Sequence, residues 1–134
     1  MRKLSQLESI GVKFTALLQQ AGIENQQQLL TSCCQRNGRL ALAAITGINL
    51  TLIYKWTTEA DLARISGIGE DYAQLLEHSG VDCVQVLAQF SAEKLFQTMQ
   101  KINEQKKLVR QMPSLSQVET WVEDAKLLPS ILAR

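Results

Sequence analysis

A short glycine turn, Gly67-Ile68-Gly69, stands between two stretches of helical apolar periodicity and is the first feature of the sequence that could do chemistry. Such a turn can aim the backbone N–H groups at the start of the second helix toward a phosphate. The next two residues, Glu70 and Asp71, are acidic and would offset the helix dipole themselves. The turn therefore predicts either a phosphate-binding site or a hairpin whose role is structural only.

The glycine turn belongs to a repeat. Residues 4–23 match residues 62–81 at a shift of 58 positions, with apolar residues and glycines in step. Ile10 of the first copy then stands where Ile68 does in the other. Each copy predicts a short helix, a tight turn, and a second helix that ends at a glycine. The isoleucine within the turn is expected to fill the gap between the two helices.

A weaker copy lies at residues 42–56, where Gly47 and Asn49 take the places of Gly67 and Gly69. Asn is the residue other than glycine that best tolerates positive φ, so we expect Asn49 to preserve the turn. Three turns are thus predicted within residues 1–90, which would form the core of the fold. The isoleucines expected to plug these turns are Ile10, Ile48 and Ile68.

Residues 91–134 predict two further helices, separated by Pro113 and stopped by Pro129. We expect them to brace the hairpins within the same compact, all-α domain. Ser91 is the expected N-cap of the first helix, and Ser116 with Glu119 the expected capping box of the second. Their expected apolar stripes are Leu95, Met99, Ile102 and Val109 in the first helix, and Val118, Trp121, Val122 and Ala125 in the second.

Composition limits the function classes. The chain has 134 residues, 46% of them hydrophobic, enough for an ordinary globular core. A net charge of +1 provides no general attraction to nucleic acid or acidic lipid, so any such binding requires local patches. No signal peptide or membrane span is expected, since no apolar run is long enough. We expect a cytoplasmic protein that does not act at membranes.

The sequence has few residues that could form a catalytic or metal-binding site. The three cysteines, Cys33, Cys34 and Cys83, show no CxxC spacing, and His78 is the single histidine. We expect no enzyme, no cofactor and no small-molecule substrate. The cysteines are expected to be reduced, buried residues, and a redox-sensing Cys33-Cys34 pair is the alternative.

The stretch LxxIxGIGxxxA at residues 62–73 resembles the helix-hairpin-helix motif of DNA repair enzymes, beta-type DNA polymerases and recombinase N-terminal domains. Over nearly its whole length the chain is similar to an uncharacterised family of small tandem helix-hairpin-helix proteins. The resemblance implies turn amides that hold a backbone phosphate without reading the base. It also leaves open a monovalent cation held by turn carbonyls.

Basic residues could add to such contacts. Lys13 of the first copy stands where Asp71 stands in the other, which makes the first copy the better phosphate site. A second basic cluster, on the exposed side of the helix that follows residue 91, could join Lys13, Arg36 and Arg39 in a track for a duplex backbone. The candidate nucleic-acid-binding residues are Ile10, Gly11, Val12, Lys13, Gly47, Asn49, Gly67, Gly69, Lys106, Lys107 and Arg110.

Two hypotheses follow from these observations. The first is a non-enzymatic module that binds the backbone of double-stranded DNA weakly and without sequence preference. The second is a protein-interaction or scaffold module in which the hairpins are structural only. Near-neutral charge and the acidic turn at Gly67 favour the second hypothesis, and the repeated turns favour the first.

Overall fold

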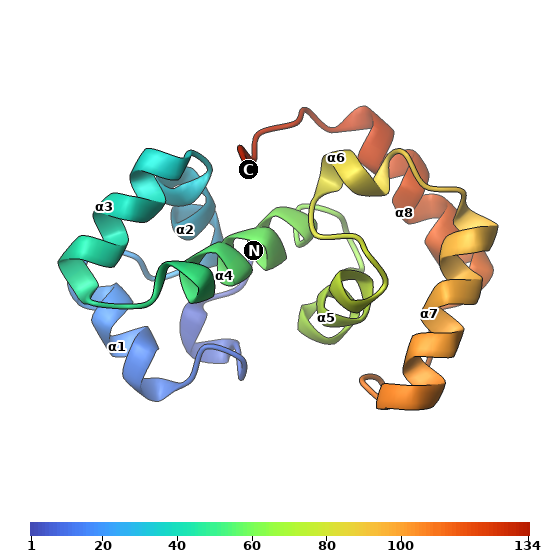
Figure 1. Ribbon diagram of the computed structural model, residues 1–134, viewed down its shortest axis with the longest axis horizontal. Helices are drawn as coiled ribbons and strands as arrows, with labels where there is room; N and C mark the ends of the chain where they lie inside the picture. Colours follow the sequence, from blue (N-terminus) through green and yellow to red (C-terminus); the bar gives the residue numbers. More distant parts are fainter. The chain divides into compact units, whose positions relative to one another are not determined.

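The computed structural model describes all 134 residues as helices joined by turns, coloured along the chain in Figure 1. The prediction of an all-α chain is confirmed, because the only extended pairing is an isolated bridge between Lys3 and Asn25. No helix has the length and apolar character needed to cross a membrane. The elements are the 3-10 helix η1 (Leu4–Gln6), α1 (Val12–Gln20), α2 (Gln26–Cys33), α3 (Arg36–Thr46), α4 (Leu50–Leu62), α5 (Glu70–His78), α6 (Val84–Leu87), α7 (Ala92–Lys106) and α8 (Leu115–Leu127).

The chain forms two compact units, each with its own hydrophobic core. The first unit comprises Met1–Asp61 and Ile131–Arg134, and the second unit comprises Leu62–Ser130. This division does not coincide with the boundary expected at residue 90, because α7 and α8 share a core with α5 and α6. The last residues of the chain join the first unit, where the Ala133 N–H donates to the Cys34 carbonyl at 2.7 Å.

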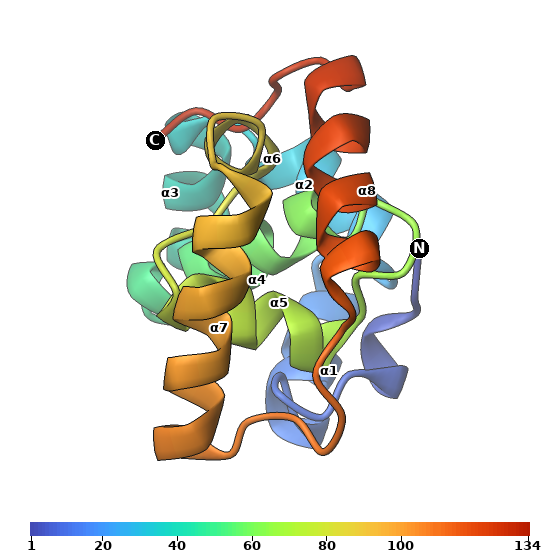
Figure 2. The ribbon, with the colours of Figure 1, turned by 90° about the vertical axis from the view of Figure 1, so that its right-hand side faces the viewer.

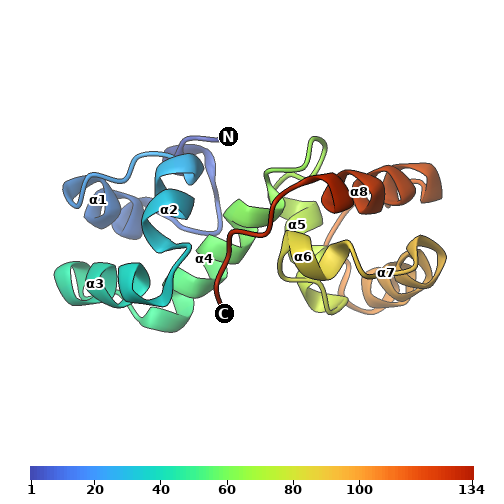
Figure 3. The same cartoon turned by 90° about the horizontal axis from the view of Figure 1, so that it is seen from above.

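In the first unit, a close approach of two backbones fixes how α2 and α3 pack. The two helices are in contact, and Figure 3 shows their axes at an angle to each other. Gly38 of α3 faces the end of α2, and a Cβ at Gly38 would lie 1.8 Å from the Ser32 carbonyl oxygen. Only glycine fits this contact, since no side chain can share that space. The buried apolar residues of this unit are Leu4, Leu7, Ile10, Leu18, Ile23, Leu29, Cys33, Leu42, Ile48, Ile53 and Trp56.

In the second unit, α7 and α8 lie side by side and run in opposite directions (Figure 2). Helix α5 packs on α7, and α6 packs on α8. Their apolar faces meet in one core, as the periodicity predicted for the C-terminal helices. The buried core residues include Leu62, Ile65, Ile68, Leu75, Leu76, Val84, Leu87, Leu95, Met99, Val118, Trp121, Val122 and Ala125.

The predicted turn isoleucines are buried as expected. Ile10, Ile48 and Ile68 each expose 4% of their surface. The shift of 58 residues also holds in the hydrogen bonds that end α1 and α5. After α1, the Ala21 N–H donates to the carbonyls of Leu17 and Leu18, the Gly22 N–H to that of Gln19, and the Ile23 N–H to that of Leu18. After α5, the Ser79 N–H donates to the carbonyls of Leu75 and Leu76, the Gly80 N–H to that of Glu77, and the Val81 N–H to that of Leu76.

The fourth helix of each unit carries a tryptophan that meets an aromatic residue of the first. Trp56 of α4 contacts Phe14, and Trp121 of α8 contacts Tyr72. The helices α4 and α8 have 13 residues each and repeat their tryptophans at a shift of 65 positions. By the order of elements, α3 and α4 therefore correspond to α7 and α8. The sequence predicts these two pairs in different parts of the fold, the core at residues 1–90 and the brace at residues 91–134.

Two details of the C-terminal helices were predicted wrongly. Helix α8 begins at Leu115, so its capping box is Ser114 with Gln117, two residues before the predicted Ser116 and Glu119. The motif Ser-x-x-Gln/Glu occurs twice in succession, and the chain uses the copy that directly follows Pro113.

Val109 lies beyond the end of α7 and so is not part of its helical stripe, although it is buried. The side chain of Asn103 holds this residue in place. Its Oδ1 accepts from the Val109 N–H at 3.0 Å, and its Nδ2 donates to the Val109 carbonyl at 3.1 Å. Ser91 is the N-cap of α7 as predicted, without a side-chain capping bond.

Candidate functional site

The first turn presents the start of α1. Gly11 has φ +84° and is followed by the first helical residue, Val12, which is 90% exposed. No side chain caps this helix, and its first turn has no acidic residue but holds the exposed Lys13. Ser9 stands where Gly67 does at the shift of 58 residues, and its hydroxyl donates to Glu59 at 3.4 Å within the unit. The turn keeps the features expected of an anion site.

The second turn differs from its prediction. Gly47 is the left-handed C-cap of α3 with φ +73°, but Asn49 has no positive φ. Instead the Asn49 side chain accepts a hydrogen bond from the Thr51 N–H at 2.8 Å, which caps the start of α4. Asn is a preferred N-cap for this reason. A backbone amide that a phosphate would need here is therefore already bound.

The third turn is followed directly by two acidic residues at the start of α5. Gly67 has φ +93°, while Gly69 has φ −89° and is the N-cap of α5. Glu70 and Asp71 both lie in the first turn of α5. Their charge favours the helix and disfavours an approaching phosphate. This turn is also crowded, because a Cβ at Gly67 would lie 3.2 Å from the indole nitrogen of Trp121.

The basic cluster of the C-terminal part lies in the second unit. Lys106 is in the last turn of α7, Lys107 is its left-handed C-cap with φ 52°, and Arg110 is exposed in the connection to α8. Cations near a helix C-terminus are favoured by the dipole, which gives the two lysines a structural reason. This cluster belongs to the second unit, whereas Lys13, Arg36 and Arg39 belong to the first.

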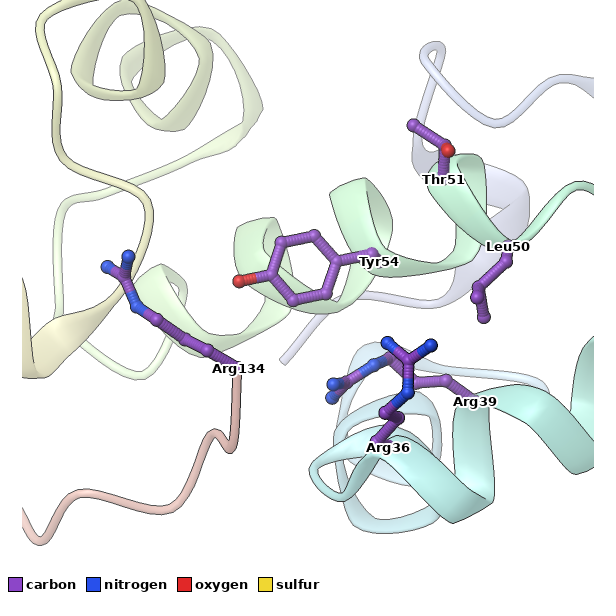
Figure 4. A pocket seen from close by; sticks show the side chains of 6 residues that line it. All are labelled: Arg36, Arg39, Leu50, Thr51, Tyr54 and Arg134. Carbon is purple, nitrogen blue, oxygen red and sulfur yellow. The ribbon is translucent and has the colours of Figure 1, made fainter.

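A pocket in the first unit gathers arginines. It has a volume of about 270 Å³ and contains no acidic lining residue. Figure 4 shows the side chains of Arg36 and Arg39, both from α3, turned toward α4 and Tyr54. The lining residues are Arg36, Arg39, Leu50, Thr51, Tyr54 and Arg134.

Arg39 is the buried member of this group, with 2% of its surface exposed. Its Nη1 donates to the carbonyls of Cys33 at 2.9 Å and Cys34 at 3.4 Å, at the end of α2. Its guanidinium carbon lies 5.0 Å from the centre of the Tyr54 ring, a cation–π arrangement. Arg39 pairs with no carboxylate and its Nε and Nη2 have no acceptor within the chain. The one buried side-chain polar atom without a hydrogen bond is Glu59 Oε1, so the free nitrogens of Arg39 keep some access to solvent.

Arg36 stands at the first position of α3, is exposed, and makes no hydrogen bond or ion pair. Together with Arg39 it places two positive charges at the start of a helix whose first turn has no acidic residue. The N-terminus of a helix carries a partial positive charge, so the two arginines and the helix dipole together make the potential of the pocket more positive. Overall, the first unit has seven basic and four acidic side chains, and the second unit has seven and nine.

The cysteines are all free thiols. Cys33 and Cys83 are buried as predicted, whereas Cys34 is only partly buried. Burial raises the pKa of the Cys33 thiol, while a hydrogen bond with Thr57 and the charge of Arg39 partly oppose this shift. No cluster of three or more His, Cys, Asp or Glu side chains is arranged to hold a metal ion.

Sequence reasoning named Arg36 and Arg39 but missed the pocket that they share with Tyr54 and Thr51. The spacing of the two arginines, three residues apart, places them on one helix face and was a usable signal. Their meeting with α4 and with residues 131–134 depends on tertiary packing, which local patterns do not encode.

Comparison with known proteins assigns the chain to a protein family. No curated protein and no protein of solved structure was found to match the chain. One family model matches residues 8–128, which is most of the chain and includes helices of both units. The chain belongs to the family described as "Domain of unknown function (DUF4332)".

Proposed function

We propose that the protein binds nucleic-acid phosphates through its first unit, weakly and without reading bases. One observation carries this proposal: a pocket lined by three arginines and by no Asp or Glu side chain, in which the buried Arg39 forms no ion pair. Arg side chains form paired hydrogen bonds to phosphate oxygens, and phosphate contacts alone provide no sequence information. The exposed start of α1, with Lys13, adds a second phosphate contact of the kind that helix N-termini offer.

The repeated hydrogen bonds and aromatic pairs also support the finer fold that the sequence suggested. We propose that each unit contains a helix-hairpin-helix element, formed by residues 4–20 in the first unit and 62–78 in the second. In this scheme the first element faces phosphate, and the second, with Glu70 and Asp71 at its helix start, is structural. The net charges of the two units, +3 and −2, agree with this division.

The test is binding of the full chain to a fluorescent duplex of random sequence, measured by anisotropy as salt is raised. With two to four phosphates neutralised, we expect the logarithm of the association constant to fall with log salt at a slope of about −2 to −4. Changing the base sequence should leave the affinity unchanged. A flat salt dependence, or no binding at about 25 mM salt, would contradict the proposal.

Matched variants locate the interface. Arg36→Glu and Lys13→Glu each reverse one exposed charge of the first unit that forms no ion pair within the chain. Lys94→Glu makes the same change on an exposed residue of the second unit. We expect the first two variants to weaken binding by about 5-fold or more at low salt, and the Lys94 variant by less than about 2-fold.

A second function, protein interaction, is favoured by an exposed apolar face on α3. Leu40 is 42% exposed and Ile45 is 74% exposed, and the exposed Ala41 and Ala44 share their side of the helix. Such faces often mark contact sites. Sedimentation of the native protein and of an Ile45→Asp variant over a range of concentrations would test self-association through this face.

A further inference from the structure

We propose that the arginine pocket of the first unit is a site for a phosphomonoester, a terminal phosphate group that carries close to two charges. This inference rests on the function proposed above, and it names the form of phosphate that the pocket takes. The doubly charged group could come from a phosphorylated end of a nucleic acid or from a free nucleotide. The structure specifies the chemistry that both sources share.

The hydrogen bonds of Arg39 within the chain use only one side of its guanidinium group, the Nη1 nitrogen. Nη1 is committed to the carbonyls of Cys33 and Cys34, which is a structural role at the C-terminus of α2. Nε and Nη2 lie on the other edge of the planar group and have no acceptor in the chain. That edge carries two parallel N–H groups, the arrangement that matches two oxygens of one phosphate.

The orientation of this edge is fixed before any ligand binds. Two carbonyls hold one side of the Arg39 guanidinium, and the Tyr54 ring covers its face at 5.0 Å. The side chain is 2% exposed, so it loses little rotamer freedom when it binds. A fixed donor pair of this kind suits one compact group better than a sliding contact along a backbone.

The charge of the pocket favours a doubly charged ligand over a phosphodiester. Arg36 and Arg39 stand near the positive end of α3, and no Asp or Glu side chain lines the pocket. A phosphodiester brings one negative charge, whereas a phosphomonoester brings about 1.5 to 2 at pH 7 and three strong acceptor oxygens.

The experiment compares ligands that differ only in the terminal phosphate. One arm measures the binding of the full chain to a duplex with 5′-phosphate ends and to the same duplex with 5′-hydroxyl ends. The other arm measures adenosine 5′-monophosphate against adenosine by calorimetry. We expect the phosphate to strengthen binding by about 10- to 100-fold in at least one arm, the range for hydrogen bonds to a charged group.

Two variants assign any preference to the pocket. Arg39→Lys keeps the charge but removes the paired N–H edge, and Arg36→Gln removes an exposed charge that forms no ion pair within the chain. Both should abolish most of the preference for the terminal phosphate. Since Arg39→Lys also loses bonds to α2 and could disturb the fold, the Arg36 variant provides the independent test. Lys94→Gln, in the second unit, is the control that should keep the preference.

The outcomes separate this inference from the proposed function. A preference only in the duplex arm identifies a nucleic-acid end, and a preference only in the nucleotide arm identifies a free nucleotide. Equal binding of phosphate and hydroxyl forms in both arms overturns the inference. If the 5′-hydroxyl duplex still binds in that case, the proposed function survives, and if nothing binds, both fail. A preference that persists in both pocket variants would also overturn the assignment to this pocket.

Discussion

The rings of Phe14 and Trp56 meet with their centroids 5.4 Å apart and their planes at 55°. Tyr72 and Trp121 repeat this contact in the second unit, at 5.4 Å and 53°. Tilted pairs at this distance are favourable beyond the area that they bury. The same contact therefore ties the first long helix to the fourth in both units.

Ile68→Ala should destabilise the protein by about 2 to 4 kcal/mol, because Ile68 is 4% exposed and its removal leaves a cavity in the turn. Chemical denaturation measures this loss. Ile45→Ala is the matched control, since Ile45 is 74% exposed and its truncation should cost less than about 0.5 kcal/mol. Equal effects of the two substitutions would mean that Ile68 does not fill the turn.

Gly38→Ala should cost about 3 kcal/mol, although alanine is the better helix former. The added Cβ would lie 1.8 Å from the Ser32 carbonyl oxygen, which is backbone and cannot move aside without shifting α2. Asn37→Ala, at the neighbouring exposed position, should change stability by less than about 0.5 kcal/mol. A Gly38→Ala variant as stable as the native protein would show that the two helices do not approach this closely.

Labelling of the native protein with a thiol reagent should modify Cys34 first, because it is only partly buried. Cys33 and Cys83 should react more slowly by about 10-fold or more, since both are buried and need local opening to react. Mass spectrometry of the labelled peptides distinguishes the sites. Fast reaction of Cys33 together with Cys34 would instead support a redox-active pair.

Stability should fall as the pH rises above about 9. Burial raises the pKa of the Cys33 thiol above its ordinary value of 9.0. In this range the unfolded chain releases the thiol proton first, which favours unfolding, so the contribution is complete below pH 9 and is lost above it. Cys33→Ala should lower stability at all pH values but lose this part of the decline. Parallel pH profiles for the two proteins would show that Cys33 titrates normally in the folded state.

Glu70→Lys should strengthen duplex binding by relieving repulsion at the start of α5. Lys13→Glu should weaken binding more than removal of Arg64, whose Nη2 donates to the Pro129 carbonyl at 2.7 Å within the second unit. Anisotropy at low salt measures all three variants. If neither the native protein nor Glu70→Lys binds duplex or single strand, the hairpin turns bind no phosphate.

Local patterns predicted much of the fold. Helices, turn glycines and buried isoleucines follow from apolar periodicity and from the few residues that accept positive φ, so Ile68 and Gly67 could be placed in advance. Asn49 could not, because capping a helix and adopting positive φ are both plausible for asparagine. The contact of Arg39 with the Cys33 carbonyl was equally out of reach, since it depends on how α2 and α3 pack.

The matched ring pairs give each unit its own optical reporter. The chain has two tryptophans, Trp56 in the first unit and Trp121 in the second, and each is 2% exposed. Trp56→Phe and Trp121→Phe would each leave a single indole whose emission shifts to longer wavelength when its surroundings admit water. Melting curves of these two variants would show whether both halves of the chain lose their cores in one cooperative step or in succession.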